Sequence, residues 1–227
     1  MVTSTTYPRF FLYFNLLILI LVCLGFGLNA WTNTESLPPA STIVWIHGLI
    51  MFSWYVLIVI QSSLIQSRKI NLHRSLGYGS IFLAVGIIIS GLAMTVTHYH
   101  RPDAQLFATI NTFIILNFTI LYGLALMYRT RSDYHKRFMT LASVAAMFPG
   151  LGRIVLGLEV NEYLSVPLWM MMALVPGAYD LATMKKIHPA SWIGGTLIII
   201  GIGFTLYLIE NEGWKELLDS LVATRSR

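Results

Sequence analysis

The chain has 227 residues, of which 56% are hydrophobic and only 11% are charged. A soluble globular domain carries about 25% charged residues, so this composition excludes an ordinary soluble domain and indicates that lipid is the main solvent. The net charge of +5 does not indicate nucleic-acid binding, because the basic residues lie in short clusters between apolar runs.

The first apolar run, Phe10 to Leu28, follows Arg9 and has the charge pattern of a signal peptide. The run is nevertheless long enough to span a bilayer, and Leu28-Asn29-Ala30 after it is a poor cleavage site. We therefore expect an uncleaved first span. Its Cys23 is the one cysteine of the chain, which excludes an intrachain disulfide and metal sites built from cysteines.

Seven apolar runs in all have about the 20 residues that a transmembrane helix needs. They are 10–29, 43–65, 75–97, 106–127, 138–158, 164–183 and 190–209. The loops between them are short, which leaves no room for a separate soluble domain. The sequence therefore predicts an all-α bundle of seven transmembrane helices over residues 1–210, followed by a tail at 211–227.

The charges at the ends of these runs predict the orientation of the bundle. One set of ends is basic and comprises Arg9, Arg68, Lys69, Arg74, Arg129, Arg131, Lys136, Arg137, Lys185 and Lys186, against one acidic residue, Asp133. The opposite ends carry Glu35, Asp103, Glu159, Glu162, Glu210, Glu212, Glu216 and Asp219, with Arg101, Lys215, Arg225 and Arg227 as cations. By the positive-inside rule the N-terminus is cytoplasmic and, after seven crossings, the C-terminus is outside.

The tail after the last run has the pattern of an amphipathic helix. Its apolar residues recur with helical spacing at Trp214, Leu217, Leu218, Leu221 and Val222. We expect this helix to lie flat on the outer leaflet, where the interface covers the apolar face. Docking against another protein is the alternative.

Two charged residues, Arg153 and Asp180, lie inside predicted spans, where ionisable groups are costly and are candidates for function. Arg153 follows Pro149-Gly150, which is expected to kink the fifth span and to free carbonyls that the guanidinium could bond. Asp180 lies five residues before Lys185, so pairing with a cytoplasmic cation is the simpler interpretation.

The histidines form two layers, which is the arrangement that haem binding across a bilayer requires. His47 and His98 could hold an outer haem b, with Arg153 in the same layer, and His73 with His135 or His188 could hold an inner one. Two imidazoles on facing helices are the usual axial ligands of such a haem.

A single metal ion is a second possibility for the inner layer. His73, His135 and His188 with Asp180 would make the three-histidine, one-carboxylate set of a catalytic zinc site. The paired motifs HxxxH and HExxH are absent, however, so three separate loops would have to converge.

A purely structural interpretation remains open for the same residues. Boundary histidines can cap helices and bind anionic lipid head groups, and Gln61, Gln66 and Asn117 are expected to form hydrogen bonds between helices. The sequence has no GxSxG, Walker or GxGxxG motif in a suitable context, so serine hydrolysis and nucleotide binding are poorly supported.

Three segments, HGLIMFSWYVLIVIQ at 47–61, LHRSLG at 72–77 and HKRFM at 135–139, resemble a bacterial family of uncharacterised multi-span membrane proteins. The resemblance covers the second to seventh spans and includes Arg153 and His188-Pro189. More remotely, the two histidine layers resemble two-haem transmembrane b-type cytochromes, and the HKRFM hairpin resembles membrane proteins that help to assemble terminal oxidases.

Together these patterns predict a bacterial inner-membrane protein that contacts membrane lipids and binds a haem, a metal ion or a quinone-like partner. Its work would be respiratory redox chemistry or the assembly of a respiratory complex. Two alternatives stay open: a non-catalytic accessory subunit of a larger membrane complex, and an intramembrane zinc hydrolase.

Overall fold

The computed structural model describes residues 9–33, 41–99 and 104–223. Several charged residues used to predict the orientation, namely Glu35, Arg101, Asp103, Arg225 and Arg227, lie outside these ranges. The described helices are α1 Phe10–Thr32, α2 Thr42–Gln66, α3 Ile70–Thr97, α4 Ala104–Met127, α5 Ser132–Ala146, α6 Phe148–Gly157, the 3-10 helix η1 Glu162–Leu164, α7 Ser165–Met184, α8 Pro189–Ile209 and α9 Glu212–Ala223.

Six of the described helical segments are long and apolar enough to cross a bilayer, and the number rises to seven if α5 and α6 form one span. The prediction of an all-α, multi-pass membrane protein is therefore confirmed. The fifth predicted run, 138–158, is not one straight helix, because α5 and α6 meet at Met147 with a bend of 44°. The expected kink is present, because Pro149 has no N–H to bond the Ala145 carbonyl and its ring would clash with that carbonyl in a continuous helix. Pro149 instead lies in the first turn of α6, where a missing N–H is tolerated.

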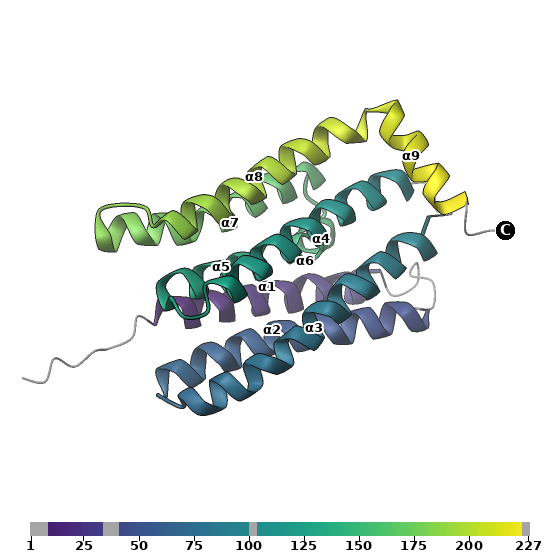
Figure 1. Cartoon of the computed structure of the whole chain (residues 1–227). Helices are drawn as coiled ribbons and strands as arrows, with labels where there is room; N and C mark the ends of the chain where they lie inside the picture. The colour runs from purple at the N-terminus through teal and green to yellow at the C-terminus, as the bar shows by residue number, and fades with distance from the viewer. Residues whose placement is uncertain (1–8, 34–40, 100–103, 224–227) are drawn as a thin grey trace, which may run out of the picture.

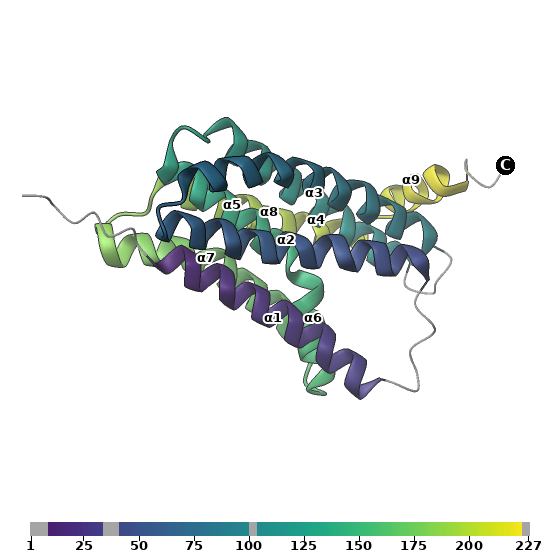
Figure 2. The same ribbon diagram turned by 90° about the horizontal axis from the view of Figure 1, so that it is seen from below.

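All the long helices run roughly along one direction (Figures 1 and 2). The start of α1 and the turns α2–α3, α4–α5 and α7–α8 lie at one end, whereas α9 lies at the other (Figure 1). We call the first end the basic end, defined by Arg9, Arg68, Lys69, Arg131 and Lys185. The other is the acidic end, defined by Glu159, Glu162, Glu210, Glu212 and Asp219.

Helix α5 forms the centre of the bundle. It is buried almost continuously from Arg137 to Ala146, and it packs against α4, α8, α1, α7 and α2. Its small residues let these neighbours approach closely, as in other membrane bundles. Two indole groups also bond to it: Trp54 Nε1 donates to Ser143 Oγ at 3.1 Å, and Trp169 Nε1 donates to the Val144 carbonyl at 2.7 Å. The packing of these neighbours therefore fixes the position of Arg137 and of the first turns of α5.

Helix α9 crosses the acidic end and packs on α4 and α8. Trp214 Nε1 donates to Thr109 Oγ1 at 2.8 Å, and Leu218 is buried. The Tyr99 hydroxyl donates to Asp219 Oδ1 at 2.7 Å. Part of the apolar face expected for the outer leaflet is therefore used within the bundle, while Leu217 and Leu221 remain exposed.

Attachment of α9 should weaken in alkaline solution. Burial and the hydrogen bond to Asp219 raise the pKa of Tyr99 to about 12, from an ordinary value near 10. Because the attached state has the higher pKa, the contribution of Tyr99 is complete below pH ~10 and is lost as pH rises toward ~12. Trp214 fluorescence should report this change.

The Tyr99→Phe variant is the control for that titration. It keeps the ring and removes the ionisable hydroxyl, so the change between pH ~10 and ~12 should disappear. Lys215, whose pKa is raised by its hydrogen bond to Glu212 on α9, is retained in the variant. An unchanged titration in Tyr99→Phe would assign the effect to Lys215 instead.

Candidate functional site

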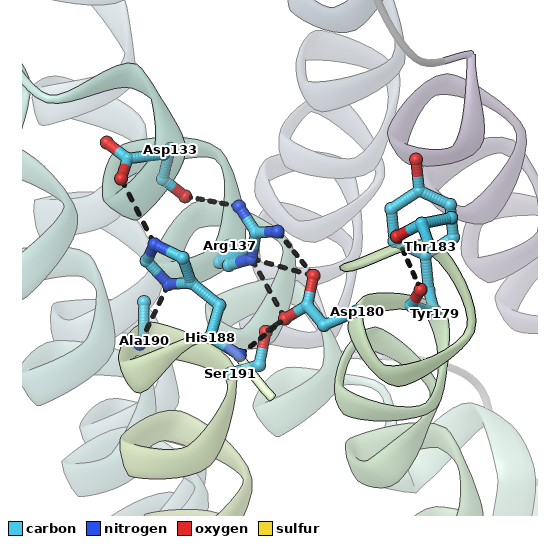
Figure 3. A network of polar contacts seen from close by, with 8 residues as sticks. All are labelled: Asp133, Arg137, Tyr179, Asp180, Thr183, His188, Ala190 and Ser191. Carbon is cyan, nitrogen blue, oxygen red and sulfur yellow. Dashed lines mark hydrogen bonds and ion pairs between the residues drawn. The ribbon is translucent and has the colours of Figure 1, made fainter. Parts of the chain in front are cut away.

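A buried ion pair joins α5 to α7 at the basic end. The guanidinium of Arg137 donates to both carboxylate oxygens of Asp180, with Nε at 3.2 and 3.1 Å and Nη2 in an additional close bond to Oδ1 (Figure 3). Nη1 donates to the Asp133 carbonyl at 2.8 Å. Arg137 is 4% exposed and Asp180 is fully buried. The expected pairing of Asp180 with a cation is confirmed, and the cation is Arg137.

The same carboxylate also organises the start of α8. Asp180 Oδ2 accepts from Ser191 Oγ at 2.5 Å and from the His188 main-chain N–H at 3.2 Å (Figure 3). Asp180 is thereby bonded on both oxygens by three residues. This network ties the basic ends of α5, α7 and α8 together, and its acceptor capacity is used by the protein itself.

His188 is the N-cap of α8, as the structural interpretation of the boundary histidines expected. Its Nδ1 accepts from the Ala190 N–H at 3.1 Å, and its Nε2 lies 3.0 Å from Asp133 Oδ2 (Figure 3). Because a main-chain N–H can only donate, Nδ1 carries the lone pair and Nε2 the proton. Both ring nitrogens are therefore occupied.

The four residues predicted to hold a single metal ion separate into two groups. Asp180 and His188 belong to the ion-pair network, whereas His73 and His135 lie together between α3 and α5. Within the described residues, no group of three or more His, Cys, Asp or Glu side chains is placed to hold a metal ion.

The structure does bring together the two residues predicted as inner haem ligands. The rings of His73 and His135 lie 6.4 Å apart between centroids, with an interplanar angle of 86°. His135 Nδ1 donates to the Ala125 carbonyl at 2.8 Å, which fixes its tautomer and leaves the lone pair on Nε2. Both residues lie one turn inside the starts of their helices.

Next to this pair lie buried polar groups that the protein leaves unsatisfied. In the part of the chain that the structure describes, four buried side-chain atoms have no hydrogen-bond partner: Asn15 Oδ1, Gln61 Nε2, Gln61 Oε1 and His73 Nδ1. Asn15 and Gln61 are 4% and 8% exposed. We call Asn15, Gln61, His73 and His135 the amide–histidine cluster.

The members of this cluster are neighbours in space. His73 interacts with the backbone of Gln61, and a Cβ placed on Gly77, one turn after His73, would lie 3.9 Å from Gln61 Nε2. Asn15 Nδ2 donates to Ser62 Oγ at 3.0 Å, so Asn15 lies against the same turn of α2. Helices α1, α2 and α3 therefore each carry a buried, unsatisfied polar group near the basic end.

The expected role of the buried amides was wrong in two cases. Within the part of the chain that the structure describes, Gln61 forms no side-chain hydrogen bond, and Asn117 Nδ2 donates to the Phe113 carbonyl of its own helix rather than to another helix. Asn15 was not predicted as a site residue. The available signal was that it is a strongly polar residue in the middle of an otherwise apolar stretch of α1.

At the acidic end, the predicted outer pair is not brought together. His47 Nδ1 bonds to Ser90 Oγ at 2.8 Å, whereas His98 Nδ1 donates to the Met94 carbonyl of its own helix at 3.0 Å. Ser90 and His98 are eight residues apart on α3, which corresponds to about 12 Å along the axis. Arg153, assigned to the same layer, lies on α6 and stacks on Phe26 of α1.

Comparisons with models of known protein families, with curated proteins and with solved structures find no match to this chain. The resemblances to an uncharacterised bacterial family, to b-type cytochromes and to oxidase-assembly proteins therefore remain predictions.

Proposed function

We propose that the protein binds a quinone-type redox lipid at the amide–histidine cluster and serves respiratory redox chemistry or assembly. The observation that carries this proposal is the set of four unsatisfied buried atoms on Asn15, Gln61 and His73. Each such atom costs about 1–3 kcal/mol when nothing bonds to it. Three residues on three neighbouring helices carry this cost near the basic end, as expected of a site that a ligand completes.

The chemistry of the unsatisfied atoms matches a quinone head group. Gln61 Nε2 can donate to a quinone carbonyl, and Gln61 Oε1 and Asn15 Oδ1 can accept from the hydroxyls of the reduced quinol. His73 Nδ1 can serve either form, according to its tautomer. Both redox states of one ligand therefore find partners among the same side chains.

The surroundings of the cluster suit a ligand with a polar head and an apolar tail. Asn15 lies five residues after the start of α1, or about 8 Å along the helix, so a head group would sit just below the membrane surface. Leu72 and Leu76, on the same helical turns as His73, are exposed and offer an apolar surface for an isoprenoid tail.

The proposed location is the inner membrane of a bacterium, with the basic end in the cytoplasm. The positive-inside rule supports this orientation, because Arg9, Arg68, Lys69, Arg131 and Lys185 all lie at the basic end. In this orientation the amide–histidine cluster would exchange ligand with the inner leaflet.

The Gln61→Met variant tests the quinone proposal. Methionine has nearly the same length but no hydrogen-bonding amide, so the ligand-free variant should be about 1–3 kcal/mol more stable than the wild type. Affinity for a short-chain ubiquinone or menaquinone should fall about tenfold, since the hydrogen bond from Gln61 Nε2 to the quinone carbonyl is lost. Thermal unfolding and calorimetric titration in mild detergent measure the two effects.

The Gln105→Met variant is the matched control. It makes the same exchange at the acidic end, where Gln105 Nε2 donates to both carboxylate oxygens of Asp219 at 3.3 Å, and quinone affinity should not change. If Gln61→Met is stabilised yet binds quinone as tightly as the wild type, the unsatisfied amide has no part in binding and the proposal is wrong.

Haem b held between His73 and His135 is the second candidate, favoured by the separation of the two rings. A metal about 2 Å from one nitrogen of each imidazole places the ring centres about 6 Å apart, close to the 6.4 Å observed. Haem predicts a sharp α-band in the dithionite-reduced spectrum that is lost in His73→Ala or His135→Ala. A bound quinone predicts no such band. A protein that binds neither haem nor quinone would favour the alternative of a non-catalytic accessory subunit.

A further inference from the structure

Arg153 is a cation on α6 that pairs with none of the acidic side chains that the structure describes. Its Nη1 donates to the Pro149 carbonyl at 3.0 Å, and its Cζ lies 4.3 Å from the centre of the Phe26 ring. None of the ion pairs among the described residues includes it. A guanidinium has five N–H donors, so the carbonyl and the ring leave most of its hydrogen-bonding capacity unused.

The contrast with Arg137 shows what is missing. Arg137 lies in the same bent helix pair, and it is bonded by the carboxylate of Asp180 and by the Asp133 carbonyl. A cation at membrane depth is costly unless an anion or water compensates it. Among the described residues, Arg153 therefore bonds to a main-chain carbonyl, as Arg137 does, but to no anion.

The position of Arg153 indicates where that anion comes from. Arg153 lies four residues before the end of α6 at Gly157, or about 6 Å along the axis, so it lies close to the acidic end of the bundle. Phe26 is 47% exposed, and Leu156, one turn after Arg153, is 53% exposed. The guanidinium thus lies beside a surface that faces lipid.

The surrounding charge favours an anion that belongs to the bilayer. The acidic end carries Glu159, Glu162, Glu210 and Glu212, which repel a free anion that approaches from water. A lipid phosphate arrives from the side, below these carboxylates, and its acyl chains can pack on Phe26 and Leu156. A planar guanidinium can also donate two parallel bonds to a phosphate.

We propose that Arg153 and Phe26 form a binding site for the phosphate of an anionic phospholipid in the leaflet at the acidic end. The guanidinium binds the phosphate, the ring of Phe26 holds the guanidinium from the other side, and the Pro149 carbonyl, one turn earlier on α6, orients it. This site is separate from the amide–histidine cluster, which lies at the opposite end of the bundle.

Native mass spectrometry of the whole chain in detergent tests the site with three probes. Phosphatidylglycerol should bind as one tightly held molecule. Diacylglycerol with the same acyl chains lacks the phosphate and should not compete with it. Inorganic phosphate, the other source of the same chemistry, should not compete at concentrations where the lipid is bound.

Substitutions then assign the tightly held lipid to Arg153. Arg153→Gln should weaken its binding at least about tenfold, and Arg153→Lys should weaken it less, because lysine keeps the charge without the paired donors. Phe26→Leu should weaken it about fivefold through loss of the cation–π contact. Arg129→Gln, which removes an exposed arginine at the basic end, is the control and should have no effect.

Three results would overturn the proposal. They are unchanged lipid binding in Arg153→Gln, equal binding of diacylglycerol, and displacement of the lipid by inorganic phosphate. If Arg153→Gln does not fold, Arg153→Lys and Phe26→Leu decide the question, because the proposal requires weaker binding in both.

Discussion

The Asp180→Asn variant should lose about 3–5 kcal/mol of stability, because Arg137 would remain buried without a counter-charge. The substitution hardly changes the size of the side chain, so the loss would reflect charge rather than packing. Thermal unfolding in detergent, followed by circular dichroism, measures it. The effect is expected to be large because Arg137 is only 4% exposed.

A second substitution should recover much of this loss. In the Arg137→Met, Asp180→Asn double variant no charge is buried, and the introduced amide oxygen can still accept from Ser191 and from the His188 N–H. Asp133→Asn is the surface control: Asp133 is about half exposed, so removing its contact with His188 should cost less than about 1 kcal/mol. If the double variant is as unstable as Asp180→Asn, charge burial is not the cause.

Leucine in place of Gly25 should destabilise the protein by about 3 kcal/mol or more, at the upper end of the range for overpacked cores. A Cβ at Gly25 would overlap the main-chain carbonyl of Gly150, and a Cβ at Gly150 would meet Val22 in turn. The obstacle is backbone, which cannot rotate away, so α1 would be forced from α6. Unfolding by heat or by a denaturing detergent should show the loss.

Gly27→Leu is the matched control for that substitution. It lies two residues further along α1, and a Cβ there has no atom within 4 Å. Since leucine favours a helix over glycine by a little under about 1 kcal/mol, this variant should be slightly more stable than the wild type. Equal destabilisation of both variants would show that the contact between Gly25 and Gly150 is not what α1 requires.

Much of the fold could be predicted because lipid imposes a simple rule. Apolar runs of about 20 residues must be helices, and the bend at Met147 followed from Pro149, whose ring cannot continue an unbroken helix. The partner of Asp180 could be predicted only as a basic residue, because several cations lie at that end. Arg137 can be identified as that partner only from the packing of α5 against α7, which the structure shows.

The candidate site was only partly accessible from sequence. His73 and His135 could be grouped because both begin a helix at the basic end, and they do lie together. His47 and His98 were grouped by the same logic, yet His47 bonds to Ser90 and His98 bonds to a carbonyl of its own helix. The unsatisfied state of Asn15 and Gln61 could not be predicted at all, since a missing partner is a property of the packed helices.

The burial of α5 implies an order of assembly during membrane insertion. Neither α5 nor α6 qualifies alone as a membrane span, and α5 carries Arg137, whose counter-ion Asp180 lies 43 residues later in the chain. A nascent chain that has reached α6 therefore holds a charged segment which lipid rejects. Its stable insertion must await synthesis of α7 and α8, so a chain truncated before Asp180 is expected to be retained by the insertion machinery or degraded.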